Sequence, residues 1–133
     1  MKAKELRIGN YVNNEQRTEI IDGIDQYRVQ CHLLSDKSRE TLYEVPLGLI
    51  KPIPLTEEWL LKFGFEYIEE VDVFTLGDFS IRSYLRINSG WSIYWCDEAN
   101  LKLSYILNDL TNLHQLQNLY FALTGEELQT TLQ

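Results

Sequence analysis

Few side chains in this 133-residue sequence have types and spacings that could do chemistry. Thiols and imidazoles are limited to Cys31, His32, Cys96 and His114. Cys31 and His32 are neighbours on an expected strand, so their side chains point to opposite faces and cannot share one metal ion. The two acidic residues that follow Cys96 would raise the pKa of its thiol and oppose a reactive thiolate. We therefore expect no metal site and no catalytic residue, with a Cys96–His114 pair left open.

Motifs for other kinds of catalysis are missing. The seven glycines stand singly, so the sequence has no Gly-rich phosphate-binding loop, and no Gly-x-Ser-x-Gly nucleophile elbow occurs. The many carboxylates offer no particular acid–base pair. A small enzyme whose site assembles from scattered residues stays an alternative, and we expect no cofactor.

The sharpest binding hypothesis concerns the basic residues of the C-terminal part. Residues 52–133 hold twelve acids and four bases, whereas residues 1–51 hold eight of each. Strand alternation predicts that three of these bases share one sheet face with two tyrosines, a face that could stack a nucleobase and hold a phosphate. The predicted binding residues are Arg82, Tyr84, Arg86, Tyr94 and Lys102. The same arginines would equally suit surface ion pairs with nearby acids.

The net charge of −8 argues against a general nucleic-acid binder, which would be basic. Acidity suits a protein that engages a basic surface of a partner. We expect a non-catalytic interaction or accessory protein whose partner is another protein. The alternative is a nucleotide or nucleic-acid binder acting through the local sheet patch.

Location is predicted from composition and hydropathy. No apolar run approaches the roughly 18 residues of a membrane span, and no signal-peptide pattern follows Met1. Two cysteines fit a reducing compartment. We expect a cytoplasmic protein without a membrane partner.

The sequence predicts an α+β fold: a small SH3-like β module over residues 1–50, followed by an antiparallel sheet with two helices over residues 51–133. Short alternating runs separated by turns indicate the first part. Helices are expected near residues 57–63, capped by Thr56 and stopped by Gly64, and near residues 112–123.

The last helix combines an apolar stripe with a polar face. The stripe consists of Leu113, Leu116, Tyr120 and Leu123. The polar face consists of His114, Gln115, Gln117 and Asn118. These polar side chains could be solvated, could bind neighbouring backbone, or could form a recognition face together with Phe121. Gly125 ends the helix, unless Thr124 and Glu127 open another short one.

Three segments carry a resemblance to a known family. They are Arg7-Ile8-Gly9-Asn10, Pro52-Ile53-Pro54-Leu55-Thr56-Glu57-Glu58-Trp59-Leu60-Leu61-Lys62-Phe63-Gly64-Phe65 and His114-Gln115-Leu116-Gln117-Asn118-Leu119-Tyr120-Phe121-Ala122-Leu123-Thr124-Gly125-Glu126-Glu127-Leu128. With them, the chain resembles a family of uncharacterised small proteins from Bacteroides-type bacteria and their phages or mobile elements. The resemblance implies only a cytoplasmic protein, with carriage by a phage as one option. It implies no activity and no catalytic residue. An accessory or anti-defence factor of a mobile element is one form of the interaction protein expected above.

Overall fold

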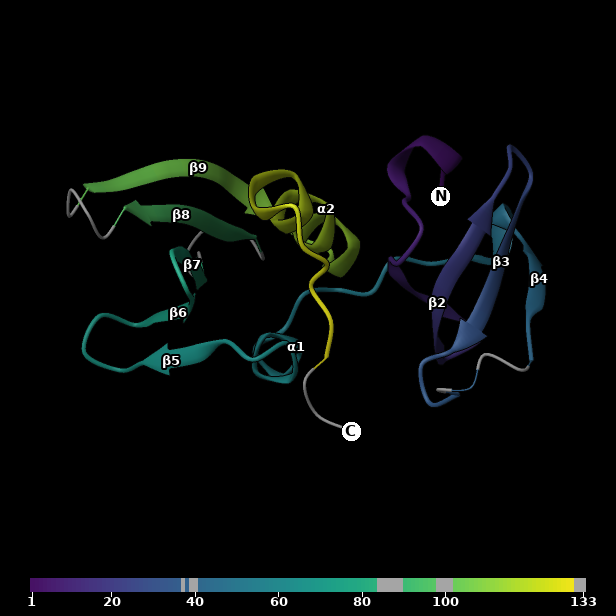
Figure 1. The fold of residues 1–133 in the computed structure, drawn as a ribbon, viewed down its shortest axis with the longest axis horizontal. Helices are drawn as coiled ribbons and strands as arrows, with labels where there is room; N and C mark the ends of the chain where they lie inside the picture. The colour runs from purple at the N-terminus through teal and green to yellow at the C-terminus, as the bar shows by residue number, and fades with distance from the viewer. Residues whose placement is uncertain (37, 39–40, 84–89, 98–101, 131–133) are drawn as a thin grey trace. The chain divides into compact units, whose positions relative to one another are not determined.

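The computed structural model describes residues 1–36, 38, 41–83, 90–97 and 102–130. Its elements, in order, are η1 (Ala3–Glu5), β1 (Tyr11–Asn14), β2 (Arg17–Ile24), β3 (Arg28–Leu33), β4 (Tyr43–Pro46), η2 (Leu47–Leu49), α1 (Glu57–Lys62), β5 (Glu66–Ile68), β6 (Val73–Leu76), β7 (Phe79–Ser83), β8 (Trp91–Asp97), β9 (Lys102–Leu110) and α2 (Leu113–Thr124). Strands dominate, and Figure 1 shows them in two separate sheets. The predicted α+β class is confirmed.

The chain forms two compact units. Unit 1 contains residues 1–54 and 112–127, and unit 2 contains residues 55–111 and 128–133. The boundary near residue 54 is close to the one expected from the prolines. Helix α2, which we had expected to belong with the C-terminal sheet, belongs instead to the unit of the N-terminal strands.

Unit 1 is built on a four-stranded antiparallel meander in the order β1-β2-β3-β4. After η2 the chain returns to β1, where Asn13 and Lys51 exchange two backbone hydrogen bonds of 2.9 Å each. The chain thus pairs again with the first strand of the sheet after η2. Its core contains Leu6, Val12, Ile21, Val29, Cys31, Val45, Leu47 and Ile50.

Unit 2 is built on a five-stranded antiparallel meander in the order β5-β6-β7-β8-β9, preceded by α1. Aromatic rings pack against one another in its interior: Phe65 lies edge-on to Phe79, and Phe74 lies edge-on to Trp91. The indole N–H of Trp91 donates to the Leu55 carbonyl over 3.1 Å, so this buried donor is satisfied.

The predicted helix boundaries hold for both helices. The Thr56 hydroxyl accepts a hydrogen bond from the Trp59 N–H, and α1 ends before Gly64, whose φ of 94° suits glycine. Gly125 has a φ of 75° and its N–H donates to the Phe121 carbonyl, so it is the C-cap of α2. Leu113 and Leu116 are fully buried, whereas Leu123, at the far end of the stripe, is 41% exposed.

Candidate functional site

The polar face of α2 is used mainly to bind the N-terminal segment of unit 1. The side-chain oxygen of Gln117 accepts from the Tyr11 N–H over 2.8 Å, and its amide nitrogen donates to the Gly9 carbonyl over 3.3 Å. Asn118 accepts from the side chain of Asn10 over 2.7 Å and donates to the Glu5 carbonyl. These bonds are not local, because each of them joins residues more than 100 positions apart in the chain.

Arg7 adds an ionic contact to this set of hydrogen bonds. Its guanidinium forms a two-point ion pair with the Glu127 carboxylate, and it lies 4.3 Å from the centre of the Phe121 ring. The Glu127 side chain is therefore occupied by Arg7. Gly9 lies close to the same carboxylate: it has a φ of +99°, and a Cβ there would meet the Glu127 carboxylate at 3.3 Å.

We call these contacts the polar interlock: the hydrogen bonds of Gln117 and Asn118 with the Glu5–Tyr11 segment, together with the Arg7–Glu127 pair. The interlock joins two of the three family-like segments within unit 1. The polar side chains of Arg7, Gln117, Asn118 and Glu127 are thus engaged in contacts within the chain.

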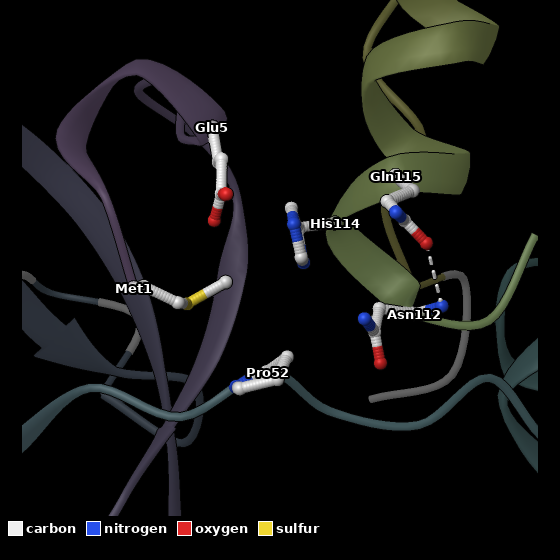
Figure 2. A pocket seen from close by; sticks show the side chains of 6 residues that line it. All are labelled: Met1, Glu5, Pro52, Asn112, His114 and Gln115. Atoms are coloured by element: carbon white, nitrogen blue, oxygen red, sulfur yellow. Dashed lines mark hydrogen bonds between the residues drawn. The ribbon is translucent and has the colours of Figure 1, made fainter.

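A pocket of about 350 Å³ lies beside the polar interlock, within unit 1. Its walls come from the N-terminal segment, from the segment before α1 and from the first turn of α2, and the lining residues are Met1, Glu5, Pro52, Asn112, His114 and Gln115. Figure 2 shows Glu5 and Met1 on one side of the pocket and the three α2-segment side chains on the other.

Hydrogen bonds fix the α2 side of the pocket. The side-chain oxygen of Gln115 accepts from the Asn112 N–H over 2.9 Å, drawn as a dashed line in Figure 2. The N–H of Leu113 donates to the Ile53 carbonyl over 2.8 Å. Two donors at this helix start are therefore already used, which leaves less capacity to bind an anion.

His114 is the chemically distinctive member of the pocket. It is only 4% exposed, and its Nδ1 has no hydrogen-bond partner among the residues that the structure describes. Burial lowers the pKa of His114, while the negative charge of Glu5 acts in the opposite direction. The imidazole is therefore neutral at pH 7 and offers one acceptor and one donor nitrogen.

The sheet patch expected from strand alternation is only partly assembled. Arg82 pairs with Ser92 and Tyr94 pairs with Ser80, so Arg82 and Tyr94 occupy diagonal positions of one parity on β7 and β8. Tyr84 and Arg86 lie outside the described residues, and the side chains of Arg82 and Lys102 are also outside the description.

The strand register separates Lys102 from the other patch positions. Lys102 pairs with Asp97, which lies three residues after Tyr94 on β8. Because successive strand positions alternate between the two faces of a sheet, Lys102 and Tyr94 are at positions of opposite parity. Leu103, and not Lys102, occupies a position of the Tyr94 parity, because Leu103 pairs with Cys96, two residues after Tyr94. Register is set by the turn between the strands, which alternation alone does not specify.

Burial around Ser92 further restricts the patch. Trp91, Ser92 and Ile93 are 5%, 0% and 0% exposed, so this part of β8 is covered on both faces. Tyr94, the next residue, is partly exposed. A nucleobase could reach the patch near Tyr94 but not beside Ser92.

Cys31 behaves as a core residue. It is fully buried, and burial, with smaller contributions from the charges of Glu19 and Asp22, raises the pKa of its thiol to about 12. Such a thiol is not a nucleophile at neutral pH. Cys96 pairs with Leu103 on β9, and its side chain lies outside the description.

One buried side-chain contact was not predicted. Nδ1 of His32 lies 2.5 Å from a carboxylate oxygen of Asp22, and His32 is 3% exposed. His32 pairs with Ile20, and Asp22 lies two residues further along β2, at the irregularity between Ile21 and Gly23 where the register shifts. Strand alternation does not reveal such an irregularity, so the sequence alone offers no signal for this contact. Within the described ranges, His, Cys, Asp and Glu do not gather in groups of three or more that could bind a metal.

Comparison with family models, with curated proteins and with solved structures found no match to this chain. Among the helices of the described part, none is long and apolar enough to span a membrane.

Proposed function

We propose that this protein is a non-catalytic interaction protein that binds a basic surface of another protein. The proposal includes an accessory, anti-defence type of role in the cytoplasm for a phage or mobile element. The observation that carries it is a cluster of carboxylates around an exposed tyrosine in unit 2.

The acidic stretch, residues 57–72, supplies this cluster. It holds six acidic residues and one base, and all six acids are exposed: Glu57, Glu58, Glu66, Glu69, Glu70 and Asp72. The single base, Lys62, already pairs with Glu58 over 3.2 Å and lies 4.8 Å from the Trp59 ring. The stretch therefore has a large surplus of negative charge for a partner to neutralise.

Tyr67 marks the centre of the acidic stretch. Its hydroxyl donates to Asp72 over 2.7 Å, and its ring packs on Phe74 with 4.9 Å between centroids while the residue stays 46% exposed. The pKa of Tyr67 is raised first by this hydrogen bond and further by the charges of Asp72, Glu69 and Glu57. Acids from α1 and from the turn after β5 thus act on one exposed ring.

This combination suits recognition of arginine or lysine side chains. A cation can stack on the tyrosine ring while the carboxylates pair with it, and tyrosine is enriched at the energetic centres of interfaces. Leu61 and Val71 are 50% and 52% exposed and add apolar contact area. Strand β5 also lies at the edge of its sheet, where main-chain pairing with a partner segment is possible.

The test is affinity capture from a host extract at low salt, followed by reconstitution of the complex from purified proteins. Tyr67→Ala and the double variant Glu69→Lys, Glu70→Lys should each weaken binding at least about tenfold, and binding should fall steeply with salt. The matched control is Glu44→Lys with Glu126→Lys in unit 1, which changes the net charge equally. Equal loss in the control, or binding unchanged in all variants, would contradict the proposal.

The two alternatives have weaker support. A nucleotide or nucleic-acid binder would use the sheet patch, from which the register removes Lys102. An enzyme with a scattered site would need an activated group, and the buried Cys31 has the opposite character.

A further inference from the structure

The pocket beside the polar interlock contains a buried imidazole nitrogen that the described residues leave unpaired, and this nitrogen accepts hydrogen bonds when the proton is on Nε2. Nδ1 of His114 is shielded from solvent and unpaired among the described residues. A buried polar atom without a partner costs roughly 1–3 kcal/mol, so native proteins seldom keep one without a ligand or water to satisfy it. The pocket provides the space for such a group.

The second feature of the pocket is the carboxylate of Glu5. Glu5 and His114 extend toward one another from η1 and from α2 (Figure 2). Glu5 is exposed, and its described contact is the Lys2 N–H at 3.5 Å, which is a weak hydrogen bond. The carboxylate therefore has free acceptor capacity on the pocket side.

We propose that this pocket binds a primary aliphatic ammonium group, which donates hydrogen bonds to the Glu5 carboxylate and to Nδ1 of His114. The Met1 and Pro52 side chains give the pocket apolar walls against which an alkyl chain can pack. This inference goes beyond the proposed function, because the pocket lies in unit 1 and the acidic stretch in unit 2.

Charge and protonation favour an ammonium over an anion. The lowered pKa of His114 keeps its imidazole neutral and able to accept a hydrogen bond. An anion would be repelled by Glu5, and the N–H groups of Asn112 and Leu113 that could have bound it are already bonded. A neutral donor could form the hydrogen bond to His114, but it would lack the electrostatic attraction between an ammonium group and the Glu5 carboxylate. It should therefore bind more weakly.

The test is an NMR titration of the full-length, ¹⁵N-labelled protein, read at the ring nitrogens of His114. The probes are butylamine, 1-butanol and butyrate, which share a chain length and differ in charge. Butylamine should shift the His114 signals with a Kd on the order of millimolar, as expected of so small a ligand. 1-Butanol and butyrate should bind at least about tenfold more weakly.

Two variants test whether butylamine binding depends on the Glu5 carboxylate. Glu5→Gln keeps the size of the side chain and should weaken butylamine binding about tenfold, because it removes the charge-assisted bond. Glu15→Gln removes an exposed carboxylate elsewhere in unit 1 and should leave binding unchanged. No shift of His114 with butylamine up to about 50 mM would overturn the proposal, since even small ligands with good contacts bind below that concentration. Equal shifts with all three probes, or equal affinity of wild type and Glu5→Gln, would also overturn it.

One further probe, Nα-acetyl-lysine methylamide, distinguishes a free amine from a lysine side chain of a partner protein. Binding of both butylamine and Nα-acetyl-lysine methylamide supports the proposal and shows that a lysine side chain fits. Binding of butylamine alone supports it for a free amine. Because these measurements use no partner protein, their failure would leave the proposed function of the acidic stretch intact.

Discussion

The two units differ in what holds them together and in how they carry charge. Unit 1 has ten acids and eight bases, a net charge of −2, whereas unit 2 has ten acids and four bases, a net charge of −6. Unit 1 joins distant segments by the polar interlock, and unit 2 packs aromatic rings inside a sheet of consecutive strands. Both units have an apolar interior, to which unit 1 adds directional bonds between distant segments and unit 2 adds an acidic exterior.

Truncating a buried ring should have the largest effect and tests the account of unit 2. Phe79 is 1% exposed and lies edge-on to Phe65. Phe79→Ala should destabilise the protein by about 3–5 kcal/mol, measured by chemical denaturation, because it removes apolar contacts and leaves a cavity. Tyr67→Ala, at a half-exposed ring, serves as the comparison and should cost much less. A small effect at Phe79 would show that ring packing is not what stabilises unit 2.

Truncating the buried stripe of α2 should have a similar but slightly smaller effect. Leu116 is fully buried, so Leu116→Ala should cost roughly 2–5 kcal/mol. Leu123→Ala, on the same helix but 41% exposed, should change the stability little. Thermal melts of both variants provide the measurement, and equal melting temperatures would show that the stripe is not buried in solution.

Removing one member of the polar interlock tests the account of unit 1. Gln117→Leu keeps the approximate side-chain volume but removes the hydrogen bonds that Gln117 makes with the Tyr11 N–H and the Gly9 carbonyl. We expect a loss of about 1–3 kcal/mol, the cost of leaving buried polar groups unsatisfied. Hydrogen exchange should show the Tyr11 amide losing protection first. Unchanged protection at Tyr11 would contradict the assigned role of Gln117.

Gly9→Ala is a smaller change to the same interlock. The φ of +99° is unfavourable for alanine, and the added Cβ would lie 3.3 Å from the Glu127 carboxylate. We expect a cost of about 1–2 kcal/mol in denaturant unfolding. Gly48→Ala is the control, because its Cβ would meet nothing within 4 Å. Equal effects of the two substitutions would mean that the Gly9 conformation is unimportant.

Protonation of His114 should have the smallest effect. Its pKa is lowered in the folded protein, so as the pH falls below the ordinary value near 6.5 the unfolded chain takes up a proton that the folded chain resists. The contribution of His114 to stability is therefore complete above that pH and is lost as the pH falls. The pH dependence of unfolding between pH 7.5 and about pH 5 should be shallower for His114→Gln than for wild type. An identical pH dependence of the unfolding free energy in wild type and His114→Gln would contradict a lowered pKa of His114.

Local patterns were enough to predict much of the fold. Alternation identified β3 through Val29 and Cys31, and capping residues identified both ends of α1. These features depend on residues close together in the chain, where periodicity and capping preferences act directly. The preference of glycine for a positive φ at a helix C-terminus likewise predicted that α2 ends at Gly125.

The contacts of the candidate sites were not predictable in the same way. Gln117 reaches residues more than 100 positions away, and nothing in its local sequence specifies that target. The pocket depends on Glu5 lying opposite His114, which requires the position of α2 to be known. Lys102 shows the remaining difficulty, because alternation does not specify how two strands are aligned, and Lys102 pairs with Asp97.

The discontinuity of unit 1 has a consequence for synthesis on the ribosome. Residues 1–54 emerge first, but α2 follows only after residues 55–111 have been made. At roughly 5–20 residues per second, translation of that intervening stretch takes about 3–11 seconds. During this time the Tyr11 N–H and the Gly9 carbonyl lack their Gln117 partner, and the nascent strands present a surface that α2 later covers. Unit 1 therefore cannot be completed until residues 55–111 of unit 2 have been made, and a chaperone able to bind that surface has several seconds in which to act.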